Sequence, residues 1–285
     1  MNKTRYSKYF DPAYLSRIKT FSLQVKEIVE GLLSGRHKSN RFGINVEFKD
    51  HREYNPGDEL RHVDWRLWAK TDRFYIKRFD EETNLYVNVI LDISKSMDFK
   101  YSGKWTKLEY AKYIAGSLLY LGLLQNDYVG LNLFSDRIDK AYPPGNRLIR
   151  INEILNELEK QAGRAGSEFR KNLIYLSEKI RKRSLVVLIS DFLGDLREIT
   201  DGVQYLKSKK NDIILFAVND PCEQDFPFKT NTRFIDMENN EELTVNAGSL
   251  QEQYKERMKS HYTGLTEFVH KSNIDICFFN RSEER

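Results

Sequence analysis

Residues 86–97, YVNVILDISKSM, decide the fold. Residues 85–91 are almost all apolar or β-branched, which is typical of a strand buried on both faces of a parallel sheet. The strand ends abruptly, and Asp92, Ser94 and Ser96 then place a carboxylate and two hydroxyls at alternate positions of one short loop. Ligands of open α/β sheets bind at the carboxyl ends of the strands. This loop is therefore the first candidate for a functional site.

Strand and helix patterns alternate along the rest of the chain. Strand patterns fall at residues 74–79, 128–134, 137–141, 185–189, 213–218 and 274–279, with a hairpin around Asn239-Asn240. Helical spacing of apolar residues falls at 106–124, 148–158, 169–176, 196–206 and 254–269. Thr106 and Glu109 have the spacing of a capping box. The alternation predicts a doubly wound α/β domain over residues 83–281 with a mainly parallel sheet and one strand, 137–141, at its edge.

Residues 1–82 are expected to form an extension packed on that domain. A cap at Asp11-Pro12 and an apolar stripe that ends at Gly35 predict a helix. Residues 1–41 hold nine Lys/Arg and three Asp/Glu, a net charge of +6 in a chain of net charge +4. A solvated helix face is the simpler explanation of this charge, because no recognised nucleic-acid module accompanies it.

Residues 47–66 combine acidic, basic and aromatic side chains around a turn at Pro56-Gly57. This mixture predicts an ordered loop, neither a plain strand nor a plain helix, in which guanidinium groups hold carboxylates and aromatic rings anchor the chain. We call this segment the clasp. Either an ion-paired structural role or a partner-docking surface fits the pattern, and the sequence leaves both open. The candidate residues are Asp50, Arg52, Tyr54, Asp58, Arg61, Asp64, Trp65 and Arg66.

The composition describes a soluble protein. Its 285 residues are 40% hydrophobic and 31% charged, and no apolar run is long enough to span a bilayer. No signal peptide is recognisable at the start of the chain. Cys222 and Cys277 form no metal-type pair, so a reducing cytoplasm is the expected location.

Two further residues fall where the Asp92 loop would need them. Asp191 directly follows the strand pattern at 185–189, and Ser167 follows the glycine-bracketed segment 163–166. If these strands are neighbours in the sheet, Asp92, Ser94, Ser96, Ser167 and Asp191 converge on one crevice. Carboxylate and hydroxyl oxygens favour Mg²⁺, with Mn²⁺ or Ca²⁺ as alternatives. A cation with so few charged ligands can accept a carboxylate from another protein. Each residue could instead serve only as a helix cap or a turn hydroxyl.

This constellation resembles the metal-ion-dependent adhesion site of von Willebrand factor A-type domains. Residues 47–66, together with Lys77-Arg78-Phe79 and Ser190-Asp191-Phe192, resemble the bacterial family called domain of unknown function 58. The resemblance covers roughly residues 30–280. It implies a partner of MoxR-type AAA+ ATPases, which act as chaperones in the maturation of other proteins. The family usually has threonine where this chain has Ser167, and serine lacks the methyl group that restricts χ1, so weaker metal binding is expected.

Two other function classes remain as alternatives to a non-enzymatic binding module. A metal-assisted phosphohydrolase could use Asp92 as its nucleophile, but Ser94 stands where a general acid would be needed. None of the P-loop, GxGxxG, HExxH or GxSxG motifs occurs. Nucleic-acid binding through residues 1–41 is the least favoured class, and it would show a steep dependence on salt.

Overall fold

The computed structural model describes residues 46–56, 58, 63–81, 84–101, 105–166 and 168–280. The chain forms two compact units, and we consider each by itself. The small unit is Lys26–Asn84, and the main unit is Leu85–Arg285 together with Met1–Val25. The helix expected near residues 11–35 lies outside the described residues. Packing of an extension over residues 1–82 on the main domain stays a prediction.

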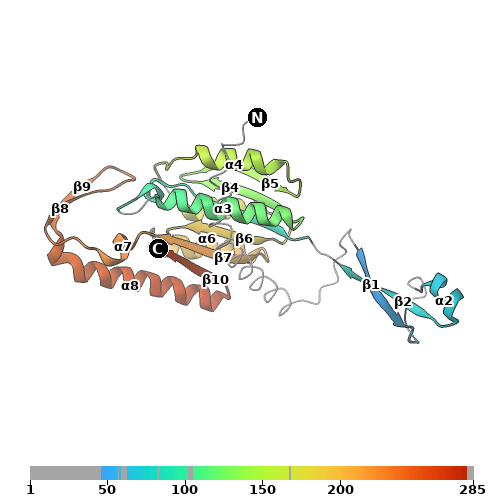
Figure 1. Cartoon of the computed structure of the whole chain (residues 1–285). Coiled ribbons are helices and arrows are strands. Elements are labelled where there is room, and N and C mark those ends of the chain that lie inside the picture. Colours follow the sequence, from blue (N-terminus) through green and yellow to red (C-terminus); the bar gives the residue numbers. More distant parts are fainter. Residues whose placement is uncertain are drawn as a thin grey trace. The chain divides into compact units, whose positions relative to one another are not determined.

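Strands and helices alternate in the main unit in the predicted order (Figure 1). Its strands are β3 Tyr86–Asp92, β4 Tyr128–Phe134, β5 Ile138–Gly145, β6 Leu185–Ser190, β7 Asp212–Asn219, β8 Asn231–Ile235, β9 Glu242–Asn246 and β10 Asp275–Asn280. Its helices are the 3₁₀ helix η3 Lys95–Asp98 and the α-helices α3 Lys107–Leu124, α4 Arg150–Lys160, α5 Phe169–Lys179, α6 Leu196–Ser208, α7 Pro221–Asp225 and α8 Ala247–Ser272. The capping box of Thr106 and Glu109 is present at the start of α3, as predicted.

The central sheet has the order β10-β7-β6-β3-β4-β5. All neighbouring strands in it are parallel except β4 and β5, so the edge strand β5 is the antiparallel one. The predicted fold class, a doubly wound and mainly parallel α/β sheet, is confirmed. The strand β3 is buried along almost its whole length because it lies between β6 and β4. The chain adds β4 on one side of β3 and later β6 on the other, which makes the β3–β6 boundary the topological switch point of the sheet.

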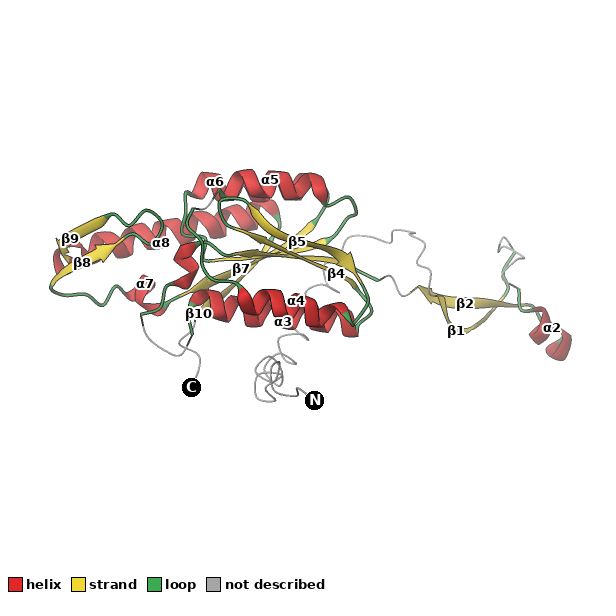
Figure 2. Cartoon of the chain, turned by 90° about the horizontal axis from the view of Figure 1, so that it is seen from above, coloured by secondary structure: helices red, strands yellow, loops and turns green. Residues whose placement is uncertain are grey.

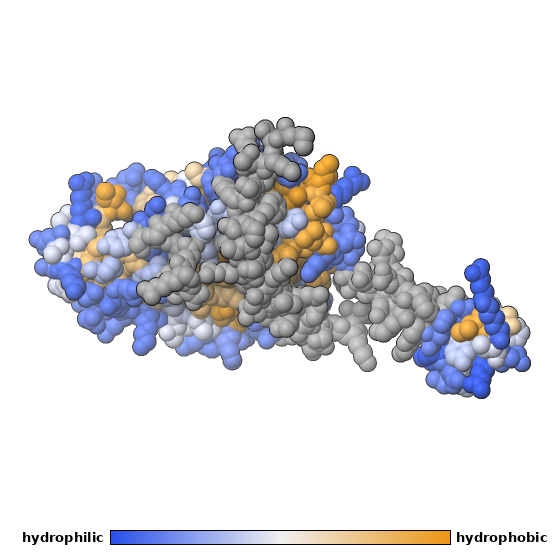
Figure 3. Space-filling model, viewed as in Figure 1, coloured by the Kyte–Doolittle hydropathy of each residue, from blue (hydrophilic) through white to orange (hydrophobic). Residues whose placement is uncertain are grey.

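Helices cover both faces of the sheet (Figure 2). The helices α3 and α4 lie on one face, while α5, α6 and α8 share a hydrophobic core on the other face with β3, β6 and β7. That core contains Leu173 of α5, Val203 of α6 and Leu265 of α8. Hydrophilic residues dominate the visible surface (Figure 3), in line with the charged composition. Among the described helices, none is both long and apolar enough to cross a bilayer.

The small unit pairs β1 Val46–Glu53 with β2 Tyr75–Glu81 in an antiparallel ribbon that carries the helix α2 Trp65–Thr71. The expectation of an ordered loop over residues 47–66 was therefore wrong for much of that segment. The reason is that β2 provides hydrogen-bond partners for the backbone N–H and C=O groups of β1. The charged segment can therefore form one strand of a two-stranded ribbon. The carboxylate of Asp64 then starts α2 by accepting the N–H groups of Arg66 and Leu67.

Asp127 anchors the start of β3, and it gives the stability of the protein a pH dependence. Its Oδ1 accepts the N–H of Leu85 at 2.8 Å. Burial raises the pKa of Asp127 from 3.8 to about 6 in the folded protein. The folded state therefore holds its proton more tightly than the unfolded state, and stability falls as pH rises from about 4 to about 6.

We expect Asp127→Asn to keep the oxygen acceptor and remove this loss. At pH 7 the variant should unfold with a free energy on the order of 1–3 kcal/mol higher than the wild type, and the difference should shrink toward zero near pH 4. Urea unfolding at a series of pH values measures this. The matched control is Asp201→Asn on the exposed face of α6. A pH-independent difference for Asp127→Asn would contradict the prediction.

Candidate metal centre

Asp92 is buried at the end of β3, at the switch point of the sheet. Its Oδ1 accepts the N–H of Ser94 at 2.8 Å, and its Oδ2 accepts the hydroxyl of Ser190 at 2.7 Å. Ser190 is the last residue of β6, the parallel neighbour of β3. The two strands end together because they run in the same direction. A side-chain hydrogen bond thus joins them across the crevice in which the functional site was predicted.

The two predicted serines of the Asp92 loop lie against the two aspartates. The hydroxyl oxygens of Ser94 and Ser96 are 3.1 Å apart, and Ser94 is buried. Both hydroxyls help to hold the charged form of an aspartate: Ser94 acts to lower the pKa of Asp92, and Ser96 acts to lower that of Asp191. The loop turns into η3 directly after Ser94. Four of the five predicted ligands are therefore in one cluster.

A tight turn after β6 sets the position of Asp191. Phe192 has a φ of +53°, a left-handed conformation that costs a residue other than glycine about 1–3 kcal/mol. The hydroxyl of Ser190 accepts the N–H of Phe192 at 3.1 Å, and Asp191 accepts the N–H of Leu193 at 3.2 Å. On the other side, His261 of α8 is 2.6 Å from the carbonyl oxygen of Phe192. These contacts hold the turn, and with it the Asp191 carboxylate, beside the Asp92 loop.

The two aspartates differ in their charge balance. Burial, followed by the negative charge of Asp191, raises the pKa of Asp92 to about 6. Burial acts in the same direction on Asp191, but the ammonium of Lys107 outweighs it and holds the pKa of Asp191 below its ordinary value. Asp92 accepts hydrogen bonds from the backbone N–H of Ser94 and from the hydroxyl of Ser190. An added cation beside Asp92 would relieve the repulsion that raises its pKa.

Lys107 is a functional-site residue that sequence reasoning missed. Its side chain is 0% exposed, and its ammonium donates to Asp191 at 2.8 Å and to Glu223 at 2.5 Å. Burial lowers the pKa of Lys107, but these two carboxylates outweigh burial and raise it above the ordinary value. The position alone, at the first turn of α3, suggested only a helix start. A lysine within the buried face of a helix was the available signal.

Glu238 is a second residue that was missed. It lies in the turn between β8 and β9, and its carboxylate accepts the N–H of Ser96 at 2.9 Å and the N–H of Gly166 at 2.5 Å. Gly166 directly precedes Ser167, the fifth predicted ligand, which itself lies outside the described residues. The acidic sequence of the hairpin, residues 236–242, was the only hint in the sequence.

The donor set fits a hard divalent cation. Asp92 and Asp191 supply carboxylate oxygens, and Ser94 and Ser96 supply hydroxyls, the oxygen ligands that Mg²⁺ and Ca²⁺ prefer. The carboxylates of Glu223 and Glu238 also lie at this cluster, the former bound to Lys107 and the latter to the N–H of Ser96, and Lys95 stands between Ser94 and Ser96 in the loop. Nowhere in the described residues do three or more His, Cys, Asp or Glu side chains form a group that could hold a metal ion. Metal binding here would therefore depend on the hydroxyls, and it stays a prediction.

The clasp residues mostly serve the small unit itself. Arg52 binds Asp58 through two hydrogen bonds of 2.7 and 2.8 Å, which keeps the pKa of Asp58 low, and His51 lies 2.9 Å from Asp64. The ring of Tyr54 is 6.1 Å from that of Phe74.

The remaining clasp candidates are Asp50, Arg61, Trp65 and Arg66. Trp65 and Arg66 are exposed on α2, and Trp65 contacts the rings of Trp68 and Phe74. Asp50 lies in β1, where Arg78 is its partner across the ribbon, and Arg61 lies outside the described residues. A docking role for the clasp stays a prediction.

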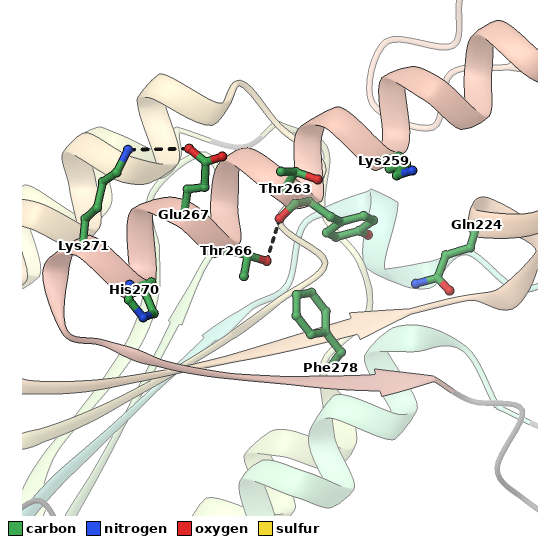
Figure 4. Close-up of a pocket in the computed structure, with 9 residues that line it drawn as sticks. Gln224, Lys259, Thr263, Thr266, Glu267, His270, Lys271 and Phe278 are labelled. Carbon is green, nitrogen blue, oxygen red and sulfur yellow. Dashed lines mark hydrogen bonds and ion pairs between the residues drawn. The ribbon is translucent and has the colours of Figure 1, made fainter.

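A separate hollow of about 750 Å³ lies between α8, α7 and β10. Figure 4 shows Lys259, Thr263, His270 and Lys271 along α8, with Phe278 of β10 below them. Lys271 pairs with Glu267 at 3.5 Å on the surface of the same helix. The polar groups are spread along the helix, without the convergence that distinguishes the Asp92 cluster, so we do not assign the functional site to this hollow.

Comparison with known proteins finds relatives that cover most of the chain. The sequence pattern of the family described as "Protein of unknown function DUF58" matches residues 50–264. "Uncharacterized protein Rv1480" of Mycobacterium tuberculosis is 24% identical over 223 residues, which is 76% of this chain and 68% of the relative. "Uncharacterized protein Mb1516" of Mycobacterium bovis matches to the same extent.

Solved structures give weaker matches. An aerotolerance-related membrane protein of Bacteroides fragilis is 17% identical, with a TM-score of 0.46 over 70% of this chain and 93% of that protein. The conserved hypothetical protein BatB of Bacteroides thetaiotaomicron is 16% identical, with a TM-score of 0.42 over 67% of this chain and 99% of that protein. The SpRpn10 VWA domain is 12% identical, with a TM-score of 0.42 over 71% of this chain and 91% of that domain.

Replacing Lys107 should test its role as the internal counter-charge. We expect Lys107→Met to lower the free energy of unfolding by about 3–5 kcal/mol, because Asp191 and Glu223 would remain buried without their ammonium. Urea unfolding in the presence of a chelator measures the loss. Lys160→Met, at the exposed end of α4, is the control and should change stability by less than about 0.5 kcal/mol. Equal stabilities of the two variants would contradict this role.

Proposed function

The chain belongs to the DUF58 family, and from this premise we propose that its main unit is a metal-dependent protein-interaction module. Asp92, Ser94, Ser96, Ser167 and Asp191 would hold Mg²⁺, or Mn²⁺ or Ca²⁺ in its place. When bound, the cation supplies a Lewis-acidic position that a carboxylate oxygen of another protein can fill. The module is not an enzyme in this proposal, because the chain's own groups bind and orient and none of them transfers a group.

The observation that carries the proposal is the pair of buried carboxylates at the β3–β6 switch point. Burial, followed by the negative charge of Asp191, raises the pKa of Asp92 to about 6. Burying such a pair of carboxylates without a cation is costly. Ser94 and Ser96 place neutral oxygens on the same side. Serines in place of further acids leave a bound divalent ion with unsatisfied positive charge, which favours a carboxylate from a partner.

We propose a MoxR-type AAA+ ATPase, or a client protein of that ATPase, as the partner, and the cytoplasm as the location. Support for this partner comes from the family resemblance of residues 47–66 and of Ser190-Asp191-Phe192. The chemistry of the site supports the more general requirement, which is an acidic side chain exposed on the partner. The chaperone role of such a pair in protein maturation is part of the same proposal.

Calorimetry with Mg²⁺ tests the metal site directly. The wild-type chain should bind Mg²⁺ with measurable heat, and Asp92→Ala should reduce the affinity at least about tenfold because a charged ligand is lost. The control Asp201→Ala, on the exposed face of α6, should bind as the wild type does. Thermal unfolding in chelator checks that both variants fold. Equal heats from wild type and Asp92→Ala would rule out the site.

Capture from bacterial lysate tests the partner. The full chain should retain an AAA+ ATPase in the presence of Mg²⁺ and lose it when a chelator is added. Asp92→Ala should fail to retain the ATPase in either buffer, whereas Asp201→Ala should behave like the wild type. An ATPase that stays bound in chelator, or to Asp92→Ala, would contradict a metal-mediated contact.

A further inference from the structure

The β8–β9 hairpin reaches back to the candidate metal centre through a single side chain. The Glu238 carboxylate accepts one N–H from each of two loops, that of Ser96 at 2.9 Å and that of Gly166 at 2.5 Å. These loops carry the predicted ligands Ser96 and Ser167. Glu238 is 142 residues from Ser96 and 72 from Gly166, so only the tertiary fold creates this contact.

The turn of the hairpin is organised to present Glu238. Asp236 accepts the backbone N–H of Glu238 at 2.7 Å through its side chain, and its carbonyl oxygen accepts the N–H of Asn240 at 2.9 Å. Asn240 has a φ of +59°, which closes the turn. The Glu238 side chain itself is partly buried, whereas its neighbours Asn239 and Asn240 are exposed.

The rest of the hairpin is weakly held. Ile235 and Leu243 are 53% and 61% exposed, and a two-stranded ribbon alone is marginally stable in water. Two ring contacts, of Phe234 with Phe226 at 5.6 Å and with Phe228 at 5.3 Å, join β8 to the segment after α7. The Glu238 carboxylate adds two hydrogen bonds, which join the hairpin to the loops of Ser96 and Gly166.

We propose that Glu238 is the chain's own occupant of the position at which a partner's carboxylate would bind, an inference that rests on the proposed metal site. The hydroxyl of a serine lies within about 4 Å of its own backbone nitrogen by covalent geometry. The Glu238 carboxylate, 2.9 Å from the nitrogen of Ser96, is thus within about 7 Å of the predicted ligand oxygen. It has the charge and the oxygen chemistry of the expected partner group. In this proposal the turn shifts so that the carboxylate reaches a cation held by the Asp92 loop.

This arrangement makes the hairpin a competitor of the partner. An external acidic segment has to displace Glu238 before it reaches the cation, so its affinity is reduced by the fraction of molecules in which the hairpin is closed. Removing the Glu238 carboxylate should open the position without removing any of the predicted loop ligands. The partner chemistry that fits is a segment with an exposed carboxylate.

The test uses the full chain, Mn²⁺ and the peptide acetyl-Gly-Glu-Gly-amide. In Glu238→Ala, we expect Mn²⁺ to bind more weakly than in the wild type, and the relaxation of water protons by bound Mn²⁺ to increase because water replaces the carboxylate. The peptide should bind the Mn²⁺ form of Glu238→Ala at least about tenfold more tightly than that of the wild type. Glu241→Ala, an exposed acid in the same turn, should match the wild type in every measurement. The Gly-Gln-Gly analogue of the peptide should bind neither variant.

Amide hydrogen exchange in metal-free protein separates the two levels of the proposal. The amides of Ser96 and Gly166 should exchange faster in Glu238→Ala than in Glu241→Ala. Unchanged exchange, or unchanged peptide affinity in a variant that binds Mn²⁺, overturns the role of Glu238 and leaves the metal site standing. A wild-type chain that binds no Mn²⁺ at all overturns the metal site, and this inference with it.

Discussion

Two carboxylates buried together at the ends of β3 and β6 are the constraint on which the main unit depends. Parallel pairing forces the ends of these strands to meet, so Asp92 and Asp191 cannot separate without breaking the sheet. Burying two such charges is costly unless they are paired or hydrogen-bonded. The surrounding elements offset the cost of burying the two charges in different ways for the two residues.

The charge of Asp191 is balanced by a side chain of the protein itself. Lys107, at the start of α3, places a fully buried ammonium between Asp191 and Glu223. This links the helix on one face of the sheet to the turn after β6 and to α7. For Asp92 the contacts are the hydroxyl of Ser190 and the N–H of Ser94, which stabilise the charge but do not neutralise it. This difference between the two carboxylates is the reason the proposed cation is placed on the Asp92 side of the pair.

The loops around the pair are tied to one another, so an event at the site reaches distant parts of the chain. Ser96 and Gly166 meet through Glu238, and His261 of α8 holds the carbonyl of Phe192. The hairpin and α8 are consecutive elements of the chain. Displacement of Glu238 by a partner would thus free the hairpin that leads directly into α8.

The sequence by itself determined the order of the strands and helices, the fold class, and the cluster of Asp92, Ser94, Ser96 and Asp191. These features follow from local patterns. A buried strand, a capping box and a polar residue at a strand end can each be recognised from a few consecutive residues. A strand was predicted at residues 74–79, but its pairing with β1 was not, because residues 49–53 are all charged or polar and show no apolar alternation. Only the tertiary structure decided the roles of Lys107 and Glu238. Their contacts join segments more than 70 residues apart, and such contacts arise from the packing of whole elements, which no local pattern records.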